Sequence, residues 1–114
     1  MDSLERCRII LGLSSNNESK INLLEVLLEK SREDIEAFCR DTFIDDSGAD
    51  VFPNQLKNVQ EDLAIQRFRK LGAEGENSYS LADESITFDE LLSDSMKNRL
   101  YPFRRLFPRT NVKG

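Results

Sequence analysis

The stretch Ser15–Asp41, SNNESKINLLEVLLEKSREDIEAFCRD, decides the fold of this 114-residue chain. Its apolar residues recur at steps of three, four and seven, which places their side chains on one face of an α-helix. That face holds Ile21, Leu24, Leu28, Ile35 and Phe38, widened by Leu23 and Leu27. Ser15 and Glu18 have the spacing of a capping box, so we expect this longest helix to begin there and to end near Asp41.

A shorter helix is expected before this one. Asp2 followed by Glu5 is typical of a helix start. Gly12 offers a left-handed stop at the other end. The apolar contacts of this helix are expected from Leu4, Ile9, Ile10 and Leu11.

A loop and a third helix are expected after the long helix. Turn-forming residues fill Asp45–Asp50, and the closing glutamate of a calcium-binding loop is missing, so a solvated loop is predicted. Pro53 suits the first turn of the next helix because its missing N–H would have no partner there. The apolar stripe of this helix is broad, which predicts a central position; it consists of Leu56, Val59, Leu63, Ala64, Phe68 and Leu71.

The connector from Arg69 to Phe88 follows neither a helical nor a simple loop pattern. Gly72 comes directly after the last apolar residue of the third helix, which predicts a helix C-cap, and Gly75 allows a second change of direction. Alternation then predicts a small β-hairpin over residues 77–88, carried by Tyr79, Leu81, Ile86 and Phe88. A mobile surface loop is the alternative.

A fourth helix follows, begun either by Thr87 with Glu90 at capping-box spacing or by Asp89. Pro102 should stop or kink it near residues 99–101, because proline removes one backbone hydrogen bond and clashes with the preceding turn. One face of this helix carries Leu92, Met96, Leu100 and Phe103.

The predicted fold class is therefore all-α. We expect a four-helix bundle with a short first helix, a long second, a central third and a C-terminal fourth, plus the hairpin between helices three and four. Residues 1–100 would form the helical domain. Residues 101–114 would form a basic, partly disordered C-terminal segment.

Catalytic and metal-binding chemistry is not expected. The chain has no histidine, and nothing resembles a nucleophile with its base, so no enzyme activity, cofactor or metal is predicted. Cys7 and Cys39 are expected to be free buried thiols, and the acidic pairs Glu33/Asp34 and Glu61/Asp62 to lie on solvated faces. No apolar run approaches the roughly 18 residues of a membrane span.

Charge is divided unevenly along the chain. Residues 1–96 hold all 21 acidic residues and 10 basic ones, a net charge of −11, whereas residues 97–114 hold six basic residues and no acid, a net charge of +6. In this tail Tyr101, Phe103 and Phe107 alternate with arginines. Arginine and aromatic residues suit the centre of a protein interface, but they could also stack on and pair with single-stranded nucleic acid. A frayed, solvated terminus is the third possibility.

Two segments resemble a known family. DLAIQRFRKLGAEGENSYS, Asp62–Ser80, is similar to a segment of the head–tail connector proteins of long-tailed double-stranded DNA bacteriophages, in which an apolar helix leads through Arg/Lys and Gly-x-Glu-Gly into a serine-rich strand. The closing LYPFRRLF, Leu100–Phe107, resembles that family's Leu-x-x-Tyr-Arg-Arg ending, with Phe103 in place of the tyrosine. Pro102 departs from the pattern.

This resemblance implies a non-enzymatic adaptor in the virion, assembled in the host bacterial cytoplasm. Its dodecameric ring would join the portal to the stopper or tail-completion protein, while double-stranded DNA passes through without sequence-specific binding. Portal docking would fall to Tyr101, Phe103, Arg104, Arg105, Phe107 and Arg109. The turn and hairpin would serve ring assembly through Gly72, Glu74, Gly75, Tyr79, Leu81, Ile86 and Phe88. A small nucleic-acid-binding accessory protein that uses the basic tail is the alternative.

Overall fold

The structure, a computed structural model, describes residues 2–71 and 91–106. Its helices are α1 (Ser3–Leu11), α2 (Glu18–Cys39), α3 (Asn54–Lys70) and α5 (Asp94–Leu100), followed by the short 3-10 helix η1 (Tyr101–Phe103). Within these ranges the only β pairing is an isolated bridge between Ile44 and Asp50. The prediction of an all-α fold is confirmed. The predicted hairpin and its turn, from Gly72 to Phe88, lie outside the described residues.

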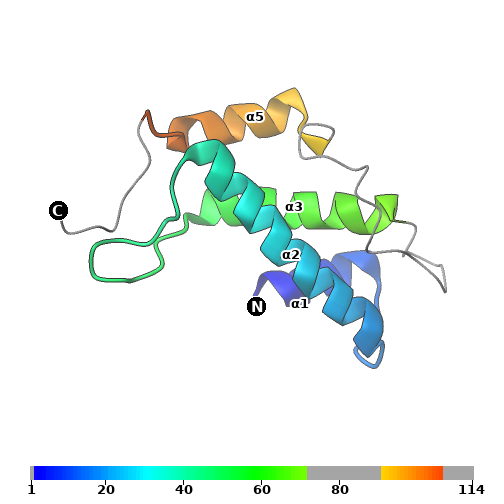
Figure 1. The fold of residues 1–114 in the computed structure, drawn as a ribbon. Helices are drawn as coiled ribbons and strands as arrows, with labels where there is room; N and C mark the ends of the chain where they lie inside the picture. The colour runs from blue at the N-terminus through cyan, green and yellow to red at the C-terminus, as the bar shows by residue number, and fades with distance from the viewer. Residues whose placement is uncertain (1, 72–90, 107–114) are drawn as a thin grey trace.

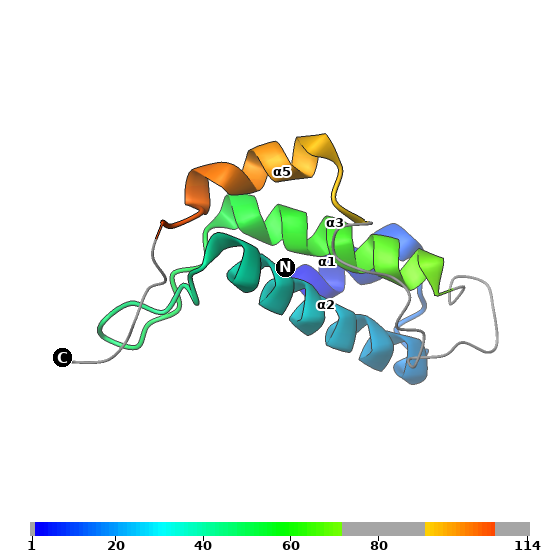
Figure 2. The ribbon, with the colours of Figure 1, turned by 45° about the horizontal axis from the view of Figure 1, so that its top comes forward.

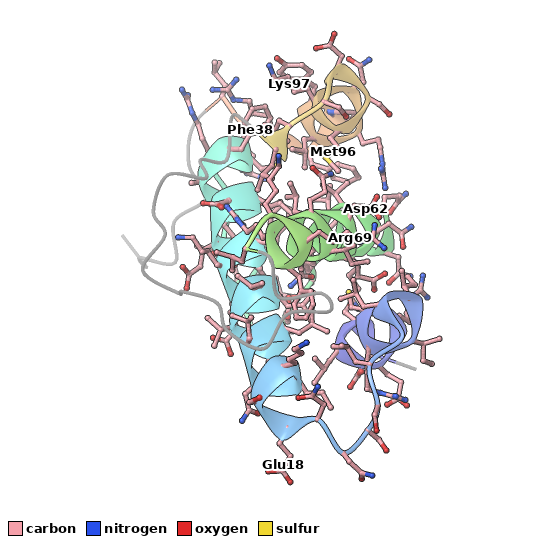
Figure 3. The ribbon with its side chains drawn as sticks, turned by 90° about the vertical axis from the view of Figure 1, so that its right-hand side faces the viewer. Glu18, Phe38, Asp62, Arg69, Met96 and Lys97 are labelled. Carbon is pink, nitrogen blue, oxygen red and sulfur yellow. The ribbon has the colours of Figure 1, made fainter. Side chains whose placement is uncertain are left out.

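The third helix is central, as predicted. α3 contacts α1, α2 and α5, whereas α2 runs along one side of the molecule and also contacts α1 and α5. Figure 1 shows α2 crossing in front of α3, and Figure 2 shows α5 lying along α3. In Figure 3, α3 lies between α1 and α5, with Glu18 at one end of α2 and Phe38 at the other. The C-terminal end of α2 is therefore the end that meets α5.

Two apolar clusters hold these helices together. The first joins α1, the N-terminal half of α2 and the C-terminal half of α3; its buried members are Cys7, Leu11, Leu23, Leu24, Leu27, Leu28, Ala64, Ile65 and Phe68. The second joins the other halves of α2 and α3 with α5 and the 41–53 loop; it contains Ile35, Cys39, Phe43, Phe52, Leu56, Val59, Leu63, Leu91, Leu92, Met96 and Leu100. The predicted stripes of α2 and α3 supply most of the first cluster and contribute Ile35, Leu56, Val59 and Leu63 to the second.

The ends of α1 agree with the sequence analysis. The Asp2 carboxylate accepts a hydrogen bond from the Glu5 backbone N–H at 2.9 Å. Gly12 has a φ of 71°, and its N–H donates to the carbonyls of the last turn. The prediction that Ile9 and Ile10 pack inward is wrong, because both side chains are at least half exposed. On this helix only Cys7 and Leu11 are buried, one turn apart on the face that meets α2 and α3.

The predicted start of the second helix is wrong, and the fourth helix is interrupted. α2 begins at Glu18 with Asn17 as its cap, accepting from the Lys20 N–H, rather than at a Ser15 cap. The starts predicted for the fourth helix, Thr87 or Asp89, lie outside the described residues. Leu91 is helical, but Leu92 and Ser93 interrupt the helix, and α5 begins at Asp94 with Ser93 as its cap. In both places a nearer residue with a short polar side chain satisfies the free N–H groups of the first turn.

Charged side chains lie between the helices as well. Glu61, predicted to be solvated, is buried, and it accepts hydrogen bonds from Ser3 at 2.6 Å and Arg6 at 3.2 Å. Arg67 is also buried, donating to the Ser31 hydroxyl at 2.9 Å and pairing with Asp34. Glu61 thus fixes α1 on α3, and Arg67 fixes α3 on α2.

Candidate docking surface

The C-terminal end of α2 closes with a residue in a strained conformation. Arg40 caps the helix in the left-handed region, with a φ of 59°, and its N–H donates to the Glu36 carbonyl. Left-handed geometry at this position usually requires glycine. The following Asp41 side chain is only 4% exposed and accepts a hydrogen bond from the Phe43 N–H at 2.9 Å. Phe43 itself has a φ of 59°.

The C-terminal part of the chain also contacts this end of α2. As Pro102 predicts, α5 ends at Leu100 and continues as η1. Phe103 is partly buried and packs against the second apolar cluster. Beyond it, the backbone N–H of Arg105 donates to the carbonyl of Cys39 at 2.8 Å. Residues 101–106 therefore lie against α2, whereas the rest of the predicted C-terminal segment, residues 107–114, lies outside the described residues.

Side chains reinforce this backbone contact. A guanidinium nitrogen of Arg105 lies 3.8 Å from the Asp41 carboxylate, and the Arg104 guanidinium lies 4.9 Å from the centre of the Phe38 ring. Arg40 reaches across from α2 and donates to the Leu106 carbonyl at 3.0 Å. Arg104 and Arg105 thus both have partners within the protein.

Apolar side chains remain exposed on the same surface. Leu106 is 78% exposed and Tyr101 is 50% exposed, although the Tyr101 ring also lies 5.6 Å from that of Phe38. Exposed aromatic and aliphatic groups beside arginines are typical of protein interfaces. We call this set, Phe38, Arg40, Asp41 and residues 101–106, the α2–tail surface.

The Cys39 thiol beneath this surface is buried. Burial raises its pKa to about 11, with a further contribution from the Asp41 charge. Its Sγ lies 3.8 Å from the Leu100 carbonyl. Cys39 is a free thiol, as is Cys7, which confirms the prediction for both. Among the described residues, no group of three or more potential metal ligands comes together, and no helix is long and apolar enough to cross a membrane.

Four of the six predicted docking residues meet on the α2–tail surface: Tyr101, Phe103, Arg104 and Arg105. Phe107 and Arg109 lie outside the described residues, as do the residues assigned to ring assembly. Phe38, Arg40 and Asp41 were not predicted as part of the surface. The sequence assigned Phe38 to the core stripe of α2, and no pattern marks the left-handed conformation of Arg40.

The fold is a small helical bundle, and its α2–tail surface exposes apolar groups beside arginines. Comparison with protein families identifies the kind of protein: the chain belongs to the phage gp6-like head-tail connector family, whose model matches residues 1–104. It is therefore a structural protein of the phage virion that associates with other head and tail proteins. The predicted family is confirmed. Searches of curated proteins and of solved structures give no match to this chain.

Proposed function

We propose that this protein forms a ring between the portal and the stopper or tail-completion protein, extending the channel through which DNA leaves the head. Membership of the head-tail connector family over residues 1–104 is the observation that carries this proposal. The ring is a dodecamer that assembles in the host cytoplasm as heads are completed. Its role is structural, without catalysis.

The uneven division of charge along the chain supports both the DNA channel and the docking on the portal. A body with a net charge of −11 lines a DNA channel without gripping the phosphates, so that DNA slides through without sequence-specific binding. Residues 97–114, with a net charge of +6, favour an acidic partner. The portal is that partner, and residues 101–114 dock on it.

Ring closure requires each subunit to present two different surfaces, one to each neighbour. The hairpin predicted over residues 77–88, entered through Gly72, Glu74 and Gly75, provides one of them. Tyr79, Leu81, Ile86 and Phe88 supply its apolar contacts.

A phage that lacks this protein tests the proposal. We expect filled heads and free tails to accumulate separately, and purified protein added to such heads to restore infectivity. Cryo-electron microscopy of the repaired particles should show twelve subunits between portal and stopper. Heads and tails that join without the protein, or density for it elsewhere in the virion, would overturn the proposal.

A further inference from the structure

We infer that the portal-docking surface is a composite of α2 and the tail, in which Arg105 is a positioning residue and does not touch the portal. The residues that face the portal are Arg40 from α2 with Tyr101, Arg104 and Leu106 from the tail. This inference rests on the proposed function and divides two adjacent arginines into different roles.

Arg105 is held to α2 at both its backbone and its side chain. Its N–H donates to the Cys39 carbonyl at 2.8 Å, and its guanidinium lies 3.8 Å from the buried Asp41 carboxylate. A buried carboxylate requires a nearby cation or hydrogen-bond donors to offset its desolvation. Asp41 also fixes the Phe43 turn, so Arg105 couples the tail to the loop that leaves α2.

The neighbours of Arg105 are exposed, and the Arg105 side chain, although paired with Asp41, itself remains 44% exposed. Successive side chains of an extended segment alternate between two sides, and the backbone of Arg104 is extended. Arg104 is exposed and lies over one face of the Phe38 ring, which fixes the guanidinium plane without burying it. Leu106 is held at its carbonyl by Arg40, while its side chain remains 78% exposed. The segment is therefore ordered before it binds.

The chemistry of this surface specifies its partner. Two ordered guanidinium groups, Arg40 and Arg104, lie beside two exposed apolar groups, Tyr101 and Leu106. They fit a portal surface on which carboxylates surround an apolar depression deep enough for a leucine side chain. Ordering the segment in advance lowers the conformational entropy lost on docking, which raises affinity without further contacts.

A double-mutant cycle on portal binding tests the assignment. Asp41→Asn removes the charge that holds Arg105 but keeps an acceptor for the Phe43 N–H, and Arg105→Gln removes the cation. We expect each change to weaken binding to the portal protein of the same phage by about tenfold and the double variant to bind no more weakly than either single one. Arg105→Lys should retain most of the affinity. In the double variant of Arg104→Gln with Asp41→Asn, by contrast, the losses of affinity for the portal protein should add in full.

Lys30→Gln, the same charge change at an exposed position elsewhere on α2, is the matched control and should bind like the unmodified protein. Melting temperatures of all variants should agree within a few degrees. Losses for Arg105→Gln and Asp41→Asn that add in the double variant, or an Asp41→Asn protein with full affinity, would show that Arg105 contacts the portal directly and would overturn the inference.

Amide exchange tests the same contact without the portal. The Arg105 N–H should be protected in the unmodified protein and should lose much of that protection in Asp41→Asn. Exchange at the rate of an unstructured peptide in the unmodified protein would overturn the inference whether or not the portal binds. A protected Arg105 N–H in a protein that never binds the portal would instead refute the proposed function, and with it the docking role assigned here.

Discussion

Arg32 on α2 donates two parallel hydrogen bonds, both 2.8 Å long, to the carboxylate of Asp50 in the 41–53 loop. The same guanidinium donates to Glu36 at 2.8 Å and lies 4.3 Å from the centre of the Phe52 ring. A bidentate pair of this kind restrains orientation as well as distance. One side chain therefore holds the loop to the end of α2 that also receives the tail.

Arg32→Lys is expected to lower the free energy of unfolding by about 1 kcal/mol, because an ammonium group can neither bond both carboxylate oxygens in a plane nor stack on Phe52 in the same way. Chemical denaturation measures the difference. Arg99→Lys is the control, since Arg99 makes an exposed contact with Asp62 at 3.3 Å, and its effect should stay below roughly 0.5 kcal/mol. Equal effects of the two changes would contradict the role of Arg32.

Acid should remove the contribution of Asp50. The hydrogen bond from Arg32 lowers the pKa of this carboxyl below its ordinary value of 3.8. The folded state therefore binds this proton less readily than the unfolded state, so the stabilisation is full above pH 3.8 and is lost as the pH falls below it. Unfolding curves of the unmodified protein and of Asp50→Asn should differ at about pH 6 and converge toward about pH 2–3. A constant difference across that range would contradict this origin.

Periodicity predicted which apolar residues are buried on α2 and α3 because both helices meet neighbours along most of their length. It could not predict α1 equally well, since a helix of nine residues buries only a narrow face and Ile9 and Ile10 fall beside it. Charges at interhelical contacts gave no signal either. Glu61 and Arg67 look like surface residues in the sequence, and only the crossing of α3 with α1 and α2 gives them partners.

The sequence predicted the tail residues of the candidate site but not the α2 residues that contact them. The run of arginine and aromatic residues marked the tail, because that mixture is visible in composition. The part of α2 that contacts the tail could not be predicted from the sequence. Cys39 contributes only its backbone carbonyl, and Asp41 contributes a carboxylate whose burial depends on the loop that follows α2. Contacts made by backbone groups cannot be recognised from the types of residue in the sequence.

Both thiols should resist modification while the protein is folded. Burial raises the pKa of Cys7 to about 12 and that of Cys39 to about 11, and only the thiolate is nucleophilic. At about pH 8, reaction of the thiols with a disulfide reagent should therefore be no faster than unfolding. In denaturant, both thiols should react together. Stability should also fall as the pH rises above 9, where unfolded thiols ionise and folded ones do not. Rapid reaction of one thiol in the folded state would contradict its burial.

Arg67→Ala should destabilise the protein by about 3 kcal/mol, because the change leaves the buried Ser31 hydroxyl without its donor and removes the cation beside Asp34. Lys70→Ala, an exposed position three residues further along α3, should change stability by less than about 0.5 kcal/mol. Denaturant titration compares the two. A small effect of Arg67→Ala would mean that the ion pair between α2 and α3 contributes little.

Reversing two charges of the tail, Arg104→Glu with Arg105→Glu, is expected to abolish portal attachment and to leave the helical body folded. Arg104 is exposed, so its reversal should affect stability by less than about 1 kcal/mol, whereas reversal of Arg105 also removes the cation beside the buried Asp41 carboxylate. At the α2–tail surface, however, the new carboxylate at position 105 would face the buried Asp41 carboxylate and detach the segment. The new carboxylate at position 104 would repel an acidic portal. Like charges at an interface can reduce affinity by several kcal/mol.

The measurement is a pull-down on purified portal, together with complementation of a phage that lacks this protein, with melting temperature as the control for folding. Lys97→Glu with Lys30→Glu makes the same total change in charge away from residues 104 and 105 and should leave attachment intact. If the doubly reversed tail still joined heads to tails, the basic segment would not be the docking element. If it kept portal binding and lost binding to single-stranded nucleic acid, the tail would serve nucleic-acid contact, and the portal would have to dock on another face of the helical body.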